Sequence, residues 1–260
     1  MSPTLENIDY SNLYCLFKGE PGTRKSTCAL SFPKPMYFVS WDRKMDALGL
    51  PMRAWGINPK EVVYDDYNDW DKVKYKIESF LITCPYKTLV IDSITSGGDA
   101  MVRQTMSTKQ GGKKIGTISV GGFDEWNAES SALTEMIALT KDLHVNKKVN
   151  VILIAHIVQK EMKSPNGDTH MARVLVTAGK TIAQKIPAYC SEVYHFNIKT
   201  GAIVGAGGKY ALKTTHTGDD FARTSLPLEQ EIEFGNEPLY DKWLLPAINK
   251  MNQPTTNKGQ

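Results

Sequence analysis

Residues 19–27, "GEPGTRKST", have the types and spacing of a loop that binds phosphate groups. Glycines let backbone N–H groups close around phosphates, a lysine reaches the outer phosphates, and a hydroxyl binds Mg²⁺. The segment departs from the usual pattern at one position, where Arg24 stands in place of a glycine. We predict a nucleotide site with Mg²⁺ held by Ser26, and the residues expected to bind the nucleotide are Gly19, Glu20, Pro21, Gly22, Thr23, Arg24, Lys25, Ser26 and Thr27.

Three further polar residues follow predicted buried strands. Asp92 ends "KTLVIDS", where an acid completes the metal shell of a phosphate-loop enzyme. Asp42 follows "YFVSW" and is predicted to orient or deprotonate the attacking water, while His156 closes "NVILIAHI" and is predicted to sense the γ-phosphate. The alternatives are an Asp92 that only caps a turn, an exposed Asp42 paired with Arg43 or Lys44, and a half-buried His156 with satisfied hydrogen bonds.

The elements that must position these residues alternate in the rhythm of a βαβ protein. Short apolar runs read as strands, and "DWDKVKYKIESFLITC" and "AESSALTEMIALTKDL" have apolar residues at helical spacing. The predicted strands are residues 13–19, 35–41, 87–93 and 150–157. We therefore predict an α/β fold with a mostly parallel sheet flanked by helices.

After about residue 180 the pattern changes to that of antiparallel strands. "SEVYHFNIKTGAIVG" is typical of a hairpin that turns at Lys199-Thr200-Gly201, and "KYALKTTH" of another strand. We expect one domain over residues 1–248 and a disordered polar tail over residues 249–260.

The composition favours a soluble protein of the cytoplasm. The formal net charge is +3, which permits a polyanionic partner without requiring one. The four cysteines show no C-x-x-C spacing, and neither a signal peptide nor a membrane-spanning apolar run is visible. We expect no membrane association.

The order of these motifs resembles the core of a RecA-type ATPase. The chain is more narrowly similar to the phage-encoded RecA-like ATPases of the Sak single-strand-annealing group, over roughly residues 10 to 248. The resemblance implies ATP and Mg²⁺ as cofactors, with Lys25, Asp42, Asp92 and His156 in catalysis. It also implies a ring or filament of identical subunits on single-stranded DNA, with a single-strand-binding protein as a partner.

The same resemblance implies two mobile DNA-binding loops. The first is "AMVRQTMSTKQGGKKIGTISVGGF", a basic stretch without acidic residues, and the second is "QKEMKSPNGDTHMARVLVTAGK", with a turn at Pro165-Asn166-Gly167. Neither offers an obvious aromatic for base stacking, and both read equally as solvated surface loops. The residues predicted to bind DNA are Arg103, Lys109, Lys113, Lys114, Lys160, Lys163 and Arg173.

The segment "DDFARTSLP" resembles the one from which family members reach a neighbouring subunit's ATP site. Arg223 would then be a catalytic arginine finger acting in trans. The alternative is a surface arginine paired with Asp219 or Asp220.

Three functions remain open from the sequence. The leading one is a DNA-dependent, oligomeric ATPase of phage recombination or replication. The second is a nucleotide-gated DNA-binding or assembly module with little hydrolysis, which Arg24 and Asp42 keep open. The third is a small-molecule or nucleotide kinase, which would need a lid with several arginines, whereas the few arginines here are scattered.

Overall fold

A nine-stranded sheet forms the centre of the protein in the computed structural model, which describes residues 9–108, 114–115, 118–119, 122–163, 166–167, 169–177, 179–199, 209–217 and 220–253. The strand order is β11-β10-β9-β1-β7-β4-β2-β3, and β8 pairs with β7. The strands are β1 (Tyr14–Gly19), β2 (Met36–Ser40), β3 (Val62–Asp66), β4 (Thr88–Asp92), β7 (Asn150–Lys163), β8 (Thr169–Leu175), β9 (Glu192–Ile198), β10 (Tyr210–Lys213) and β11 (Glu231–Phe234).

The pairing of these strands confirms the predicted fold class. All pairs from β9 to β3 are parallel, whereas β10, β11 and β8 pair antiparallel with their neighbours. The parallel part carries the predicted motifs, and the antiparallel strands β10 and β11 extend the sheet on its C-terminal side. Segments 114–115 and 118–119 form a separate two-stranded ladder, β5 and β6.

The central strands are apolar because helices cover both faces of the sheet. In β1, Tyr14 and Leu16 pack into one core, and Cys15 and Phe17 pack into the other. Successive side chains of a strand point to opposite faces, so a strand buried on both sides needs an almost continuous apolar run. This is the pattern that the sequence shows for β1, β4 and β7.

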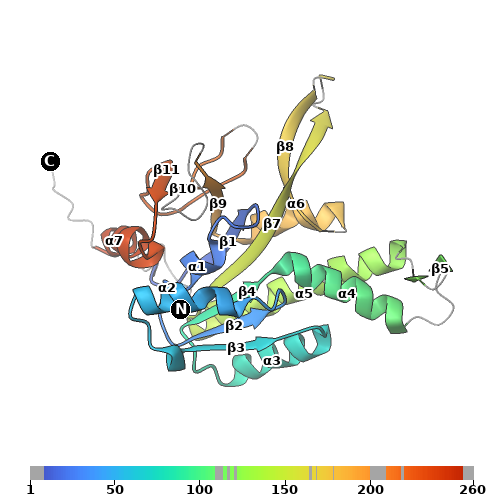
Figure 1. Cartoon of the computed structure of the whole chain (residues 1–260), viewed down its shortest axis with the longest axis horizontal. Helices are drawn as coiled ribbons and strands as arrows, with labels where there is room; N and C mark the ends of the chain where they lie inside the picture. The colour runs from blue at the N-terminus through green and yellow to red at the C-terminus, as the bar shows by residue number, and fades with distance from the viewer. Residues whose placement is uncertain are drawn as a thin grey trace, which may run out of the picture.

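Helices form a layer on each side of the sheet (Figure 1). One core contains residues of α3 (Trp70–Ile82), α4 (Ile94–Thr108), α5 (Phe123–Lys147) and α6 (Lys180–Tyr189). The other contains residues of α1 (Lys25–Ala29) and α7 (Leu245–Met251), and the partly buried Met52 of α2 (Gly49–Ala54) packs against it. Two 3₁₀ turns, Met45–Leu48 and Pro59–Glu61, and a π turn, Tyr240–Leu244, complete the helical elements of the described residues. None of the described helices combines the length and the apolar character needed to cross a membrane.

The helical periodicity places the expected residues in the core. In α3, Val73, Ile77 and Phe80 are buried, and the Asp69 side chain caps the helix by accepting from the backbone N–H of Asp71. In α5, the four residues predicted to share one face are all buried, namely Leu133, Met136, Ile137 and Thr140. Both helix predictions are confirmed.

The prediction that Ala100–Phe123 is a loop is wrong at both ends. Helix α4 continues to Thr108, and Phe123 already begins α5. Ala100 and Met101 are buried, and no glycine or proline follows Gly98 before Gly111, so nothing local stops the helix. The predicted loop is therefore confined to the connection between the two helices.

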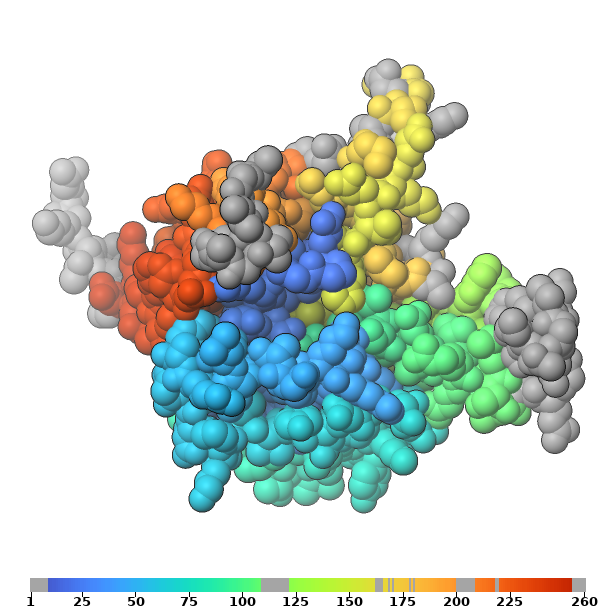
Figure 2. Space-filling model, viewed as in Figure 1, coloured from blue at the N-terminus to red at the C-terminus, as the bar shows by residue number. Residues whose placement is uncertain are grey.

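The second predicted loop is a β-hairpin arm. Strand β7 runs on past His156 to Lys163, and β8 returns antiparallel, with Gln159 opposite Arg173. Beyond the end of β1, strand β7 leaves the apolar core and forms backbone hydrogen bonds with β8 instead. The polar sequence of this part of β7 does not by itself predict that pairing. The arm, residues 157–175, projects from the body of the molecule in Figures 1 and 2.

The C-terminal part confirms the first strand of the predicted hairpin as β9 and the next predicted strand as β10, whereas the predicted return strand at residues 202–205 lies outside the described residues. The antiparallel partner of β9 is β10, with Ile198 opposite Tyr210, while Thr200 and Gly201 of the predicted turn lie outside the described residues. Helix α7 ends at Met251, so the start of the predicted tail is helical. Residues 254–260 lie outside the described part of the chain.

Candidate functional site

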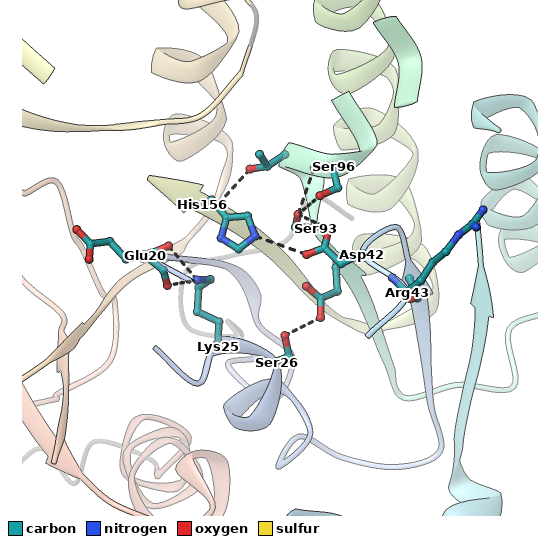
Figure 3. Close-up of polar contacts among 12 residues, drawn as sticks. Glu20, Lys25, Ser26, Asp42, Arg43, Ser93, Ser96 and His156 are labelled. Carbon is teal, nitrogen blue, oxygen red and sulfur yellow. Dashed lines mark hydrogen bonds and ion pairs between the residues drawn. The ribbon is translucent and has the colours of Figure 1, made fainter. Parts of the chain in front are cut away.

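A cavity of about 300 Å³ lies where the phosphate loop meets the carboxyl ends of β2 and β4 and the middle of β7. Its lining includes Pro21–Thr27, Asp42, Asp92 and His156. Parallel strands open at one edge of the sheet, so their following loops converge there. The cavity is large enough for a ligand of nucleotide class. Figure 3 shows the polar contacts among the converging side chains.

Lys25 folds back over the loop that precedes it. Its Nζ donates to the carbonyl oxygens of Gly19 and Glu20, both at 2.8 Å, and lies 3.4 Å from Oγ1 of Thr23. The side chain is buried, and this burial lowers the pKa of Lys25 to about 8 against the opposing charges of Asp92 and Asp42. The three acceptors carry no formal charge, so the ammonium group suits a phosphate oxygen.

Ser26 and Asp92 are joined by a short hydrogen bond. The hydroxyl of Ser26 donates to Oδ2 of Asp92 over 2.6 Å. Burial raises the pKa of Asp92, and the charge of Asp42 adds to this, although the bond from Ser26 and the charge of Lys25 oppose it. A buried carboxylate beside a hydroxyl offers two of the oxygen ligands that Mg²⁺ prefers, with water and phosphate oxygens completing its octahedral shell. The pair therefore fits Mg²⁺, which would neutralise charge developing on the phosphates.

Asp42 and His156 face each other across the cavity (Figure 3). Nε2 of His156 lies 3.5 Å from Oδ2 of Asp42, and the Ser93 hydroxyl lies 3.4 Å from Oδ1. Arg43 points away from Asp42 in Figure 3, so the observed partner of Asp42 is His156 rather than its sequence neighbour. Nδ1 of His156 is buried and has no hydrogen-bond partner among the described residues.

The surroundings of Asp42 keep it ionised. Burial alone would raise its pKa, but hydrogen bonds from His156 and Ser96, together with the charges of His156 and Lys44, outweigh burial and lower the pKa. A carboxylate with a low pKa is a weak proton acceptor at neutral pH. Asp42 is therefore better suited to orienting a water molecule than to removing its proton.

The backbone of the phosphate loop explains its glycines and its one exception. A Cβ atom on Gly19 would lie 2.5 Å from the carbonyl oxygen of Phe196, so only glycine fits beside β9. Gly22 and Arg24 both have positive φ, at 80° and 65°. Left-handed residues within a loop turn successive N–H groups into a concave anion-binding surface. Arg24 occupies a conformation that favours glycine, which is why the usual pattern has glycine there.

The Arg24 side chain is engaged outside the cavity. Its guanidinium donates to the carbonyl of Gly235 over 2.6 Å and to Oδ1 of Asn236 over 2.5 Å, and it lies over the Tyr210 ring, 4.5 Å from the centroid. None of these three partners lines the cavity. Arg24 thus connects the loop to β10 and to the segment after β11.

Arg223 lies at the other end of β9 from the phosphate loop. Its backbone pairs with Val193, whereas Gly19 is opposite Phe196. Its guanidinium donates to the carbonyl oxygens of Ala188 and Cys190, and Asp220 is not its partner. The structure does not bring Arg223 to the phosphate loop of its own chain, and its action on a neighbouring subunit stays a prediction.

The described residues among those predicted to bind DNA lie on four elements, α4, β5, β7 and β8. Arg103 is exposed on α4, and Lys114 belongs to β5. Lys160 and Lys163 belong to β7, where Lys160 is exposed. Lys109 and Lys113 lie outside the described residues.

Arg173, in contrast, is bound at the base of the arm. It donates to Oδ2 of Asp220 over 2.7 Å, and Nζ of Lys213 lies 3.0 Å from the same oxygen. Asp220 is buried, which alone would raise its pKa, but the bonds from Arg173 and Lys213 lower it. Arg173 therefore joins the arm to the sheet, and its role in DNA binding stays a prediction.

Several residues around the cavity were not identified from sequence. Ser93 and Ser96 position Asp42, and the Thr95 hydroxyl accepts from the backbone N–H of His156 over 3.0 Å. Ser40 and Lys44 line the cavity. These residues could have been found from their closeness in sequence to Asp42 and Asp92, because each lies within a few residues of one of them.

Fold and cavity together define a P-loop nucleotide-binding protein. The model of the AAA domain family matches residues 11–226. This match covers most of the chain, and the chain belongs to that family, so it carries a P-loop ATPase domain that binds nucleotide. Comparison with curated proteins gives no match.

Replacement of Arg24 separates backbone strain from nucleotide binding. Arg24→Gly and Arg24→Ala lose the same side-chain contacts, but only alanine keeps a Cβ in the left-handed conformation. We expect Arg24→Ala to be less stable than Arg24→Gly by about 1 kcal/mol in urea unfolding. Both variants should bind nucleotide, and loss of binding in Arg24→Gly would show that the arginine belongs to the cradle.

The pKa of Lys25 predicts how nucleotide affinity depends on pH. Above a pH of about 8 the lysine of the free protein loses its proton and must regain it to bind phosphate. The affinity should then fall with rising pH, by up to about tenfold per pH unit. Calorimetric titrations between neutral and alkaline pH measure this fall.

Lys18 provides the control, because burial also lowers its pKa to about 8. Lys18→Met should show the same decline in affinity as the wild type. If the decline disappears in this variant, Lys18 rather than Lys25 is the titrating group.

Proposed function

We propose that this protein is a Mg²⁺-dependent ATPase that acts in phage DNA recombination or replication, like the Sak-group proteins it resembles. In this proposal, an oligomer binds single-stranded DNA while it holds ATP and releases the DNA after hydrolysis. A single-strand-binding protein is the expected partner. The ATPase part rests on the family and on the cavity, and the DNA part rests on the observation below.

The observation that carries the DNA proposal is the continuity between the site and the arm. His156 lines the cavity, and β7 continues from it without interruption into the arm that bears Lys160 and Lys163. A second connection starts at Asp92, which ends β4. Helix α4 follows β4 almost at once and leads in sequence to Lys109, Lys113 and Lys114. A shift at the γ-phosphate contact would therefore be transmitted along rigid elements to two basic segments.

One observation favours the second function, the nucleotide-gated module. The low pKa of Asp42 makes it a poor base, so hydrolysis by an isolated subunit should be slow. In that function ATP orders an assembly on DNA and is turned over rarely. The two functions differ in whether DNA accelerates hydrolysis.

Phosphate release with and without single-stranded DNA tests the proposal. We expect stimulation by single-stranded DNA that weakens with added salt, because phosphate contacts release counterions. Lys25→Ala should abolish phosphate release with and without DNA, and this loss would assign the ATPase activity to this site. Release that does not respond to DNA at low and moderate salt, while DNA binding depends on nucleotide, would replace the ATPase proposal with the gated module.

A further inference from the structure

Two aromatic side chains are exposed to solvent at the beginning of α5. Phe123 is 74% exposed and Trp126 is 48% exposed. Residues three positions apart on a helix are neighbours on its surface, so the two side chains leave the helix from adjacent positions. The apolar residues in the middle of the helix are buried, among them Ala132, Leu133 and Met136. The aromatic pair is therefore outside the core.

The position of the pair follows from the length of the two helices. Helices α4 and α5 extend beyond the edge of the central sheet (Figure 1), so the first turn of α5 lies beyond the strands of that sheet. Burial of large aromatic rings is a major source of binding energy in proteins. Two exposed rings on one helix turn offer that energy to a ligand.

The sequence that precedes the pair is basic, whereas Asp124 and Glu125 lie between the two aromatic residues. Between Arg103 and Phe123 the sequence contains Lys109, Lys113 and Lys114 and no acidic residue. The nearby Glu125 is buried, and its Oε2 accepts from the backbone N–H of Gly122 over 2.7 Å, so it caps the helix. The ligand that complements exposed aromatic rings next to a lysine-rich sequence is an anion with flat apolar faces.

The pair also lies towards the base of the arm. Glu129, one turn beyond Trp126, accepts from the backbone N–H of Gly179 over 2.9 Å, and Gly179 follows β8 of the arm. The rings therefore stand between the connection that precedes α5 and the segment that follows the arm. A polymer that contacts both basic segments would pass close to them.

We propose that Phe123 and Trp126 form a stacking platform for the bases of single-stranded DNA, which deepens and rests on the proposed function. Unpaired bases stack on aromatic rings whatever their identity, while their phosphates follow neighbouring lysines. Duplex DNA already stacks its bases on each other and presents no free base face. The platform therefore selects single strands without reading sequence.

The test is DNA binding by the full chain with the double substitution Phe123→Ala and Trp126→Ala. With Mg²⁺ and a non-hydrolysable ATP analogue, its affinity for a labelled oligothymidylate should fall roughly tenfold or more. The slope of affinity against salt should stay unchanged, because no phosphate contact is removed. Substitution of Lys109, Lys113 and Lys114 should instead flatten that slope.

Two controls separate stacking from a general disturbance. Tyr75→Ala removes a ring that is 75% exposed on α3, and it should bind like the wild type. The double substitution Phe123→Tyr and Trp126→Phe keeps both rings and should retain most of the affinity. An abasic oligonucleotide should bind the wild type less tightly than oligothymidylate, whereas the double alanine variant should bind both equally.

The outcomes distinguish this inference from the function on which it rests. If the wild type binds no single-stranded DNA, the proposed function fails and the platform with it. If the wild type binds and the double alanine variant binds equally well, the platform alone is wrong. Unequal binding of abasic and thymidine strands by the alanine variant would also contradict it.

Discussion

The parallel pairing of β1 with β7 on one side and β9 on the other is the constraint on which the rest of the structure depends. In this register Gly19 is opposite both His156 and Phe196. The loop after β1 therefore begins beside His156 in the middle of β7, and the close approach of Phe196 requires glycine at its first position. A register shift by one residue would exchange the two faces of β1 and move the loop away from its partners.

Burial at this edge of the sheet then determines the electrostatics of the site. Burial lowers the pKa of Lys25 and raises that of Asp92, so each group is disfavoured in its charged form. A phosphate beside the lysine and a Mg²⁺ ion beside the carboxylate would each relieve that penalty. A Mg²⁺-nucleotide complex supplies both at once, which explains why the two residues belong to one site.

The sequence was sufficient for the features that depend on local pattern. The phosphate loop, the strand that ends in Asp92 and the first half of the strand that contains His156 could be predicted, because motif spacing and apolar runs are encoded in neighbouring residues. The arm could not be predicted, because its strands are polar and are stabilised by backbone hydrogen bonds between β7 and β8. Nor could the partners of Arg24, since Gly235 and Asn236 lie about two hundred residues away in the chain. The proposed stacking pair was overlooked, although Phe123 closes the first predicted loop, because its exposure depends on how far α5 extends past the sheet.

The central claim is that Ser26 and Asp92 hold Mg²⁺ beside a nucleotide bound by the loop. The most direct test compares ATP affinity in Mg²⁺ and in EDTA for the wild type and for Asp92→Asn, which keeps the shape of the side chain but removes its charge. We predict that Mg²⁺ strengthens binding to the wild type and has little effect on the variant. An equal effect of Mg²⁺ on both proteins would contradict the assignment of this site.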